Sequence, residues 1–149
     1  MTTPRPFPWR HVHFVGIGGV GMSGLAAILL DRGVGVSGSD AKDSVALDRL
    51  RARGARLAVG HAAANLAEAD LVVHSSAVGA DNPEVQAGAA RGIPTCRRGE
   101  FLARLADAFD TVIAVGGSHG KTTTTALIAH ILRELGFRPG YLVGGEVSQ

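Results

Sequence analysis

The sequence predicts an α/β fold in which a Rossmann-like parallel sheet with helices on both faces is followed by the start of a second α/β domain. Two observations lead to this prediction. Segments typical of strands and of helices alternate along the chain from residue 11. Glycine-rich turns at 16–21 and 116–120 each follow an apolar strand and precede a helix, which is the order that phosphate-binding turns require.

The first domain is expected to contain five short strands. They are rich in apolar residues and are bounded by glycine, proline or polar residues. The expected strands cover residues 11–15, 34–38, 56–59, 69–74 and 93–96. Because helical segments separate them, the sheet should be parallel. His11 and His13 alternate along the first strand, a pattern that favours an exposed face over a pair of metal ligands.

Helices are expected between these strands and after the last one. In the first helix an apolar face recurs at helical spacing, and Gly33 suits the position just after its end. The residues of that face are Met22, Leu25, Ala26 and Leu29. The second helix is expected over 43–53, with a polar cap at Asp43-Ser44 and Gly54 at its end. Its buried side is predicted to be Val45, Leu47 and Leu50. Further helices are expected from 81, with Pro83 near the first position, and over 98–109.

The first glycine turn, Gly16-x-Gly18-x-x-Gly21, has the pattern of a dinucleotide-binding turn. Glycines allow the backbone to approach a pyrophosphate at the helix N-terminus, and Asp40 at the end of the second strand can hold ribose hydroxyls. Pyrophosphate and ribose occur both in NAD and in UDP-sugars. The turn by itself therefore does not separate these two ligands.

Two features favour a UDP-sugar over NAD. Met22 and Ser23 continue the turn of small residues into the helix, and Ser75-Ser76 follows the fourth strand, at the edge where ligands cross an open α/β sheet. Both serine hydroxyls are expected to reach the diphosphate, although an ordinary turn at a strand end would also explain them.

The second glycine turn is typical of a P-loop. It follows an expected strand at 111–115 and fits the short form G-x-x-G-K-T from Gly117, although Val115 stands where the general P-loop motif has its first glycine. Lys121 would supply a positive charge to a phosphate, and the hydroxyl of Thr122 would face a magnesium ion.

Composition limits the classes of function. The chain has 149 residues, 46% of them hydrophobic, a formal net charge of +2 and aromatic residues at 5%, so a packed core is expected and a nucleic-acid groove is not. Cys96 is the single cysteine, which excludes an intrachain disulfide and favours a reducing compartment. No stretch is long and apolar enough to predict a membrane span or a secretory signal. Oligomeric state is left open.

Three segments are expected along the chain. Residues 1–10 form a proline-rich N-terminal tail, residues 11–109 a Rossmann-like domain, and residues 110–149 the truncated start of a second domain. That start would hold the strand at 111–115, the glycine turn, a helix over 126–135 and a strand-like segment at 140–144. This is too little to close a core, so the second domain is expected to be incomplete.

Motifs along nearly the whole chain from His11 resemble the Mur ligase family in order and spacing. They are GIGGVGMSG at 16–24, SGSD at 37–40, GH at 60–61 with Asn65, HSSA at 74–77, DNPE at 81–84, RGEFL at 98–102 and SHGKTTTT at 118–125. Ser118 stands where the family usually has threonine, which keeps the hydroxyl.

The resemblance implies a three-domain, cytoplasmic, ATP-dependent ligase of peptidoglycan synthesis, in particular one that joins L-alanine to UDP-N-acetylmuramate through an acyl phosphate. The first domain would bind the UDP-sugar, the central domain ATP and Mg²⁺, and the third would help to bind the amino acid. The residues implied for the UDP-sugar are Gly16, Gly18, Gly19, Gly21, Met22, Ser23, Asp40, Ser75 and Ser76. Those implied for ATP are Gly117, Ser118, His119, Gly120, Lys121, Thr122 and Thr123, with Lys121 catalytic and Thr122 a ligand of the metal.

Other functions remain open at this point. Within the family, a recycling ligase that adds a peptide to UDP-N-acetylmuramate would share these motifs, although the Gly-Met-Ser-Gly turn favours the alanine enzyme. From another class, a non-catalytic module that binds UDP-sugar or NAD would also fit. A P-loop kinase is disfavoured because the 27 residues after Thr122 contain no acidic strand end to hold magnesium. The isolated chain is expected to bind UDP-sugar without turnover.

Overall fold

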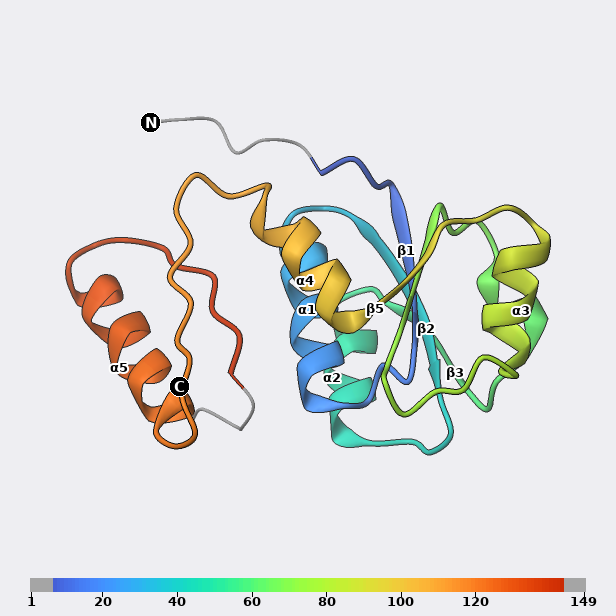
Figure 1. The fold of residues 1–149 in the computed structure, drawn as a ribbon, viewed down its shortest axis with the longest axis horizontal. Helices are drawn as coiled ribbons and strands as arrows, with labels where there is room; N and C mark the ends of the chain where they lie inside the picture. Colours follow the sequence, from blue (N-terminus) through green and yellow to red (C-terminus); the bar gives the residue numbers. More distant parts are fainter. Residues whose placement is uncertain (1–6, 144–149) are drawn as a thin grey trace. The chain divides into compact units, whose positions relative to one another are not determined.

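The computed structural model describes residues 7–143, and the chain divides into two compact units, Met1–Asp110 and Thr111–Gln149. The first unit contains a five-stranded, fully parallel sheet with the order β3-β2-β1-β4-β5, which places β1 at its centre (Figure 1). The strands are β1 (His11–Val15), β2 (Gly35–Asp40), β3 (Arg56–Val59), β4 (Leu71–His74) and β5 (Thr95–Arg97). The predicted Rossmann-like class is confirmed.

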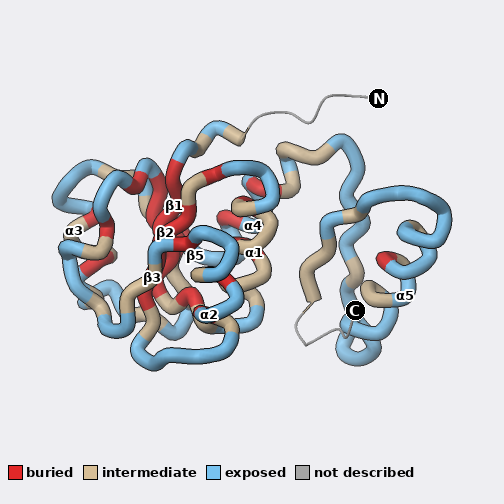
Figure 2. Tube along the Cα trace, turned by 180° about the vertical axis from the view of Figure 1, so that it is seen from behind, coloured by how far each residue is buried: buried red, intermediate tan, exposed pale blue. Residues whose placement is uncertain are grey.

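Helices cover both faces of this sheet, as predicted (Figure 1). One face carries α1 (Val20–Asp31), α2 (Val45–Ala52) and α4 (Arg98–Ala106), and the other carries α3 (Pro83–Ala90) with the 3₁₀ helix η1 (Ala63–Leu66). Figure 2 shows that burial is concentrated in the strands between these two layers. Among residues 7–143, no helix is both long and apolar enough to cross a membrane.

The apolar face of α1 is confirmed in full, because Met22, Leu25, Ala26 and Leu29 are its buried residues. Gly33 has a positive φ of 75°, which explains why glycine ends this helix. In α2 the prediction is right for the cap, where Ser44 accepts a hydrogen bond from the N–H of Leu47.

One residue of α2 was predicted wrongly. Leu47 and Leu50 are buried, but Val45 is 65% exposed. Val45 is the first residue of the helix and precedes Leu47 by two positions, about 200° around the axis at 3.6 residues per turn. It therefore points away from the sheet.

Boundaries agree closely elsewhere. The strands at 11–15 and 56–59 have the predicted limits, and the other three begin or end one or two residues away from them. Asn82 caps α3 and Pro83 is its first residue, as expected. Helix α4 stops at Ala106, three residues early, and η1 (Ala63–Leu66) lies between β3 and β4, where no helix was predicted.

Residues 7–10, which were expected to belong to the N-terminal tail, pack on the first unit. The Trp9 ring lies 5.1 Å from that of Phe101, and the Phe7 ring lies 6.1 Å from that of Phe109. Arg32 lies over the Phe109 ring at 4.7 Å. Phe7 and Trp9 therefore contact the rest of the first unit, and residues 1–6 lie outside the described part of the chain.

The two histidines of β1 are buried, contrary to the expected exposed face. His13 is fully buried and His11 nearly so, because β1 is the central strand and both its faces are covered. The Oγ of Ser37 on β2 lies 2.8 Å from Nε2 of His11 and 2.8 Å from Nδ1 of His13. Burial and the nearby charge of Arg56 lower the pKa of His11, which favours its neutral form.

The carboxylate of Glu84, on α3, is the acceptor on which these polar groups converge. It is fully buried, and it accepts hydrogen bonds from Nε2 of His13 at 3.3 Å and from the hydroxyl of Ser39. The side chain of Asn65 donates at 2.6 Å and the backbone N–H of Ala62 at 3.0 Å. Donors from β1, β2 and the segment around η1 thus meet on one helix residue.

These donors set the ionisation of Glu84. Burial alone would raise its pKa, but the hydrogen bonds from His13, Ser39, Asn65 and the Ala62 N–H outweigh burial and lower the pKa from 4.5 to about 2. The carboxylate is therefore charged when folded. With Glu84 as an acceptor only, Nε2 of His13 donates the hydrogen bond between them.

The described part of the second unit contains one helix, α5 (Lys121–Glu134), which begins five residues before the predicted helix and ends one residue before its predicted end. The predicted strand at 111–115 is not formed, and Val112 and Ile113 are 55% and 58% exposed. A parallel strand needs neighbours for its backbone hydrogen bonds, and no strand of the described residues pairs with this one. Residues 140–143 also form no strand, and Gly144 lies outside the described residues.

Replacing Glu84 with Gln is expected to destabilise the first unit by about 2–4 kcal/mol at neutral pH, because an amide NH2, which only donates, would replace one accepting oxygen and face groups that also donate. Urea unfolding followed by fluorescence of Trp9, the single tryptophan, measures this loss. The matched control is Glu100→Gln, which removes only an exposed ion pair with Arg104 and should change stability little.

Comparison of wild type with Glu84→Gln at different pH values also tests the pKa of Glu84. A folded pKa below the unfolded value gives stability that is present above pH 4.5 and is lost as pH falls toward 2. Over that window wild-type stability should fall by up to about 3 kcal/mol from this group, at 1.36 kcal/mol per pKa unit. Glu84→Gln lacks this component, so an equally steep decline in the variant would contradict the assignment.

Candidate phosphate-binding turns

The first glycine turn is held against the end of β2 by backbone hydrogen bonds. The N–H groups of Gly16 and Ile17 donate to the carbonyl oxygen of Ser39, at 2.8 Å and 3.1 Å. Gly16 has a φ of 80°, a conformation that side chains other than glycine rarely adopt. The chain therefore turns sharply after β1 and leads into the N-terminus of α1.

Asp40 supports this turn from beside it. Its Oδ2 accepts a hydrogen bond of 2.8 Å from the N–H of Gly18, and its Oδ1 accepts one of 3.3 Å from the N–H of Lys42. A Cβ at Gly18 would lie 2.9 Å from Oδ2 of Asp40 and 3.0 Å from Cδ1 of Leu47. Glycine at this position permits the close approach, so Asp40 has a structural function in the turn besides any contact with a ribose.

The structure brings the turns after β1 and β4 together. A Cβ on Gly16 would lie 3.1 Å from the Cβ of Ser75, so Ser75 borders the glycine turn. Its Oγ accepts a hydrogen bond from the N–H of Ala77, and Ser76 beside it is exposed. The oxygen of Ser75 thus stabilises its own turn, and both hydroxyls lie at the carboxyl edge of the sheet, where the ligand was expected.

Met22 and Ser23, which were predicted to contact the UDP-sugar, make contacts within the protein instead. Met22 is 2% exposed and belongs to the core, and its backbone N–H donates to the carbonyl of Gly19, so its side chain is not available to a ligand. The hydroxyl of Ser23 donates to the carbonyl of Val20 within the first turn of α1. Gly19 is exposed and Gly21 is half-buried.

Sequence reasoning missed residues that border this site. His61 donates toward Ser39 at 2.8 Å, and it lies 3.7 Å from the carboxylate of Glu84. Arg98, the first residue of α4, lies against Gly21. The motifs that contain these residues, GH at 60–61, DNPE at 81–84 and RGEFL at 98–102, were the only sequence signals that could have drawn attention to them.

The second glycine turn also has the geometry of an anion cradle. Gly117 and Gly120 have positive φ values of 146° and 77°, and Gly120 directly precedes α5 without a side chain to cap it. The first N–H groups of a helix have no acceptor within it, so those of Lys121, Thr122 and Thr123 are available to an anion. The ammonium of Lys121 donates to the carbonyl oxygens of Gly117 and Ser118, at 2.6 Å and 3.2 Å.

The described residues around this turn offer few ligands to a metal ion. Ser118, His119 and Thr122 are exposed, and Nδ1 of His119 lies 3.2 Å from the Ser118 hydroxyl. Within residues 7–143, no three His, Cys, Asp or Glu side chains are grouped so that they could hold a metal ion. Thr122 would supply one oxygen ligand to Mg²⁺, and the phosphates of a bound nucleotide would have to supply others.

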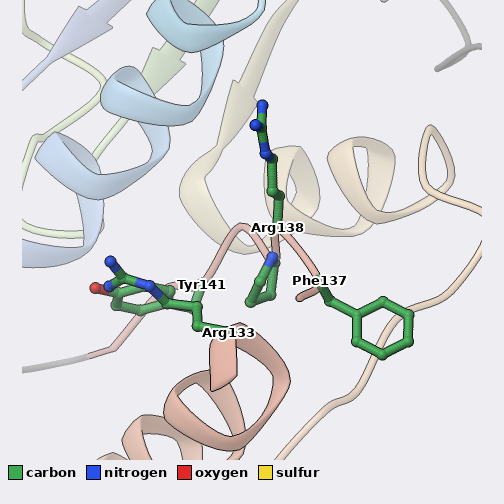
Figure 3. A pocket seen from close by; sticks show the side chains of 5 residues that line it. Arg133, Phe137, Arg138 and Tyr141 are labelled. Carbon is green, nitrogen blue, oxygen red and sulfur yellow. The ribbon is translucent and has the colours of Figure 1, made fainter. Parts of the chain in front are cut away.

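A pocket of about 330 Å³ lies at the other end of α5. Its lining includes Arg133, in the last turn of α5, and Phe137, Arg138 and Tyr141, which follow the helix (Figure 3). The 14 residues of α5 span about 20 Å at 1.5 Å per residue. The pocket is therefore separate from the glycine turn at the start of the helix.

Comparisons with known proteins give matches along most of the chain. Residues 11–110 match the model for the Mur ligase family, catalytic domain. The chain is 56% identical over 136 residues to UDP-N-acetylmuramate–L-alanine ligase from Renibacterium salmoninarum, which covers 91% of this chain and 29% of the relative. The chain spans less than a third of the curated relatives it matches.

Solved structures are also similar. A UDP-N-acetylmuramate–alanine ligase from Thermotoga maritima superposes with a TM-score of 0.79 at 37% identity, covering 84% of this chain and 29% of that one. A UDP-N-acetylmuramate:L-alanyl-gamma-D-glutamyl-meso-diaminopimelate ligase from Neisseria meningitides superposes with a TM-score of 0.82 at 37% identity, covering 92% and 43%.

Replacing Asp40 with Ala is expected to loosen the first glycine turn, because the N–H of Gly18 loses its acceptor. Amide hydrogen exchange at Gly18 should accelerate, and stability should fall by about 1–2 kcal/mol. Asp40→Asn keeps an amide oxygen and should retain most of the protection. The control is Asp43→Ala, which removes an exposed carboxylate that pairs with Arg51 and should leave exchange at Gly18 unchanged. If exchange at Gly18 is also unchanged in Asp40→Ala, the structural function of Asp40 is contradicted.

Proposed function

The chain belongs to the Mur ligase family, and from that premise we propose that it forms the N-terminal part of a ligase that joins L-alanine to UDP-N-acetylmuramate in peptidoglycan synthesis. The first glycine turn carries this proposal. It combines a backbone free to approach a diphosphate, an acid at the end of β2 and two serines at the end of β4. The names of relatives that are about half identical to this chain support the choice of substrate.

In this proposal the two units divide the work. Residues 11–109 bind the UDP portion through Gly16, Gly18, Gly19, Gly21 and the serines at 75 and 76, with Asp40 toward the uridine end. Residues 110–149 are the start of the ATP-binding domain. The whole enzyme would act in the cytoplasm, and the 149-residue chain by itself would bind UDP-sugar without turnover.

The proposed reaction has two steps. The lactyl carboxylate of the sugar takes the γ-phosphoryl group of ATP, which leaves ADP and an acyl phosphate; the amine of L-alanine then attacks the acyl carbon and releases phosphate. Lys121 would leave the carbonyls of its own turn to stabilise charge on the transferring phosphoryl. Mg²⁺, held in part by Thr122, would neutralise charge on the phosphates when bound.

The recycling ligase is a second candidate, because the Neisseria structure is named as a ligase for a peptide and UDP-N-acetylmuramate and its match covers 92% of this chain. The alanine enzyme is better supported, because the curated relatives that bear its name are 49–56% identical to this chain, whereas the two solved structures, one of each enzyme, are both 37% identical to it. A non-catalytic NAD-binding module would use the same glycine pattern, and it would be distinguished from a ligase by binding NAD in place of a UDP-sugar.

Titration calorimetry of the 149-residue chain with UDP-N-acetylmuramate, NAD and Mg-ATP tests the proposed function. We expect binding of the uridine nucleotide, none of NAD, and little of Mg-ATP, because the described residues lack a grouped set of metal ligands. A folded chain that prefers NAD, or that ignores the uridine nucleotide, would refute the assignment of the first turn.

The division of work between the turns predicts a selective effect of Lys121→Ala. The variant can be made in a chimaera that joins this chain to the remaining part of the Renibacterium relative. Release of ADP in the presence of L-alanine should fall by at least about 10³-fold, while UDP-N-acetylmuramate binding stays within about twofold. Parallel loss of both would contradict the separation of the two sites.

A further inference from the structure

Arg98 lies over the start of α1, close to the first glycine turn. It is the first residue of α4, which packs beside α1 on the same face of the sheet (Figure 1). A Cβ added to Gly21 would lie 2.9 Å from a terminal nitrogen of the Arg98 guanidinium and 3.4 Å from its Cδ. The guanidinium therefore occupies the space that any side chain at position 21 would need.

The position of Arg98 is not explained by stability. Cations are unfavourable at a helix N-terminus, and α4 begins with Arg98 directly after Arg97 at its cap. Within the described residues 7–143, no ion pair or hydrogen bond engages the Arg98 guanidinium, which is exposed. The nearest acid along the helix, Glu100, pairs with Arg104 instead, at 2.5 Å.

The first turn itself carries no positive charge. None of residues 16–23 is charged, and the N–H groups of Gly16, Ile17 and Gly18 already donate to the Ser39 carbonyl or to the carboxylate of Asp40. A diphosphate carries at least two negative charges, and guanidinium groups match phosphate oxygens with paired, charge-assisted hydrogen bonds. An unengaged guanidinium beside such a turn supplies the missing charge.

We propose that Arg98 binds the diphosphate of the UDP-sugar, and that position 21 is glycine so that this guanidinium can lie across the start of α1. The inference rests on the proposed function, because it assigns a further binding residue to the same site. It also accounts for a glycine inside a helix, where alanine would be the more stable residue.

The test compares Arg98→Met with Arg98→Lys and with Arg104→Met in the 149-residue chain. Methionine keeps an apolar stem, and loss of a cation at a helix N-terminus should not unfold the protein. Arg98→Met should weaken UDP-N-acetylmuramate binding by about 10- to 100-fold in calorimetry, and Arg98→Lys should restore part of it. Arg104→Met makes the same change in net charge on the same helix and should bind within about twofold of wild type.

Two further measurements separate a phosphate contact from general damage to the site. Binding of uridine, followed by NMR, should be the same in wild type and Arg98→Met, because uridine has no phosphate. The salt dependence of UDP-N-acetylmuramate binding should be shallower in Arg98→Met, since one cation fewer meets the ligand.

Gly21→Ala gives an independent check that does not remove the charge. The added Cβ displaces only the end of a flexible side chain, so this variant should fold with a higher thermal midpoint while binding the UDP-sugar more weakly. In the Arg98→Met background the same substitution should cost little further affinity, because the group that it displaces is already gone.

The outcomes distinguish the two proposals. A folded wild-type chain that does not bind UDP-N-acetylmuramate refutes the proposed function and the inference with it. Wild-type binding that Arg98→Met leaves unchanged overturns the assignment of Arg98 alone. An equal loss of uridine and UDP-N-acetylmuramate affinity in Arg98→Met would also overturn it, because the residue would then support the shape of the site and not contact the phosphates.

Discussion

The architecture of the first unit depends on one buried charge, the carboxylate of Glu84. A buried carboxylate is unfavourable unless donors surround it, and its donors come from β1, β2 and the segment around η1. Those segments must therefore take fixed positions relative to α3. Apolar packing holds α1, α2 and α4 on the opposite face with less directional demand, so the polar face specifies the arrangement and the apolar face supplies most of the burial.

Ser39 connects this buried network to the phosphate turn. Its hydroxyl donates to Glu84 and its carbonyl oxygen accepts the N–H groups of Gly16 and Ile17, while the next residue, Asp40, accepts from Gly18. The side chain of Ser39 thus ties the end of β2 to Glu84, and its backbone carbonyl holds the glycine turn. A change in the network around Glu84 would shift Ser39 and, through it, the glycine turn. The geometry of the site therefore depends on the fold as well as on the glycine motif.

Sequence reasoning predicted what local patterns determine. The five strands of the first unit, the buried face of α1 and the cap at Ser44 follow from periodicity and capping chemistry, and these predictions are confirmed. The burial of His11 and His13 was not predictable in this way, because it depends on the central place of β1 and on a carboxylate 71 positions after His13. The predicted strand at 111–115 is absent for a related reason. A strand needs a neighbouring strand for its backbone hydrogen bonds, whereas a helix such as α5 makes its backbone hydrogen bonds within itself.

The two glycine turns differ in how their cations are engaged. Lys121 donates to two carbonyls of its own turn, so a phosphate at the second turn must displace those bonds before the ammonium can serve it. Arg98 has no such bonds among the described residues, and its guanidinium lies beside a turn whose backbone is already held by Ser39 and Asp40. A site that has its backbone fixed and its cation unengaged loses little on binding an anion, because few internal interactions are exchanged for the new ones. On this argument the first turn is prepared for its ligand within the first unit, whereas the second must rearrange its lysine to bind.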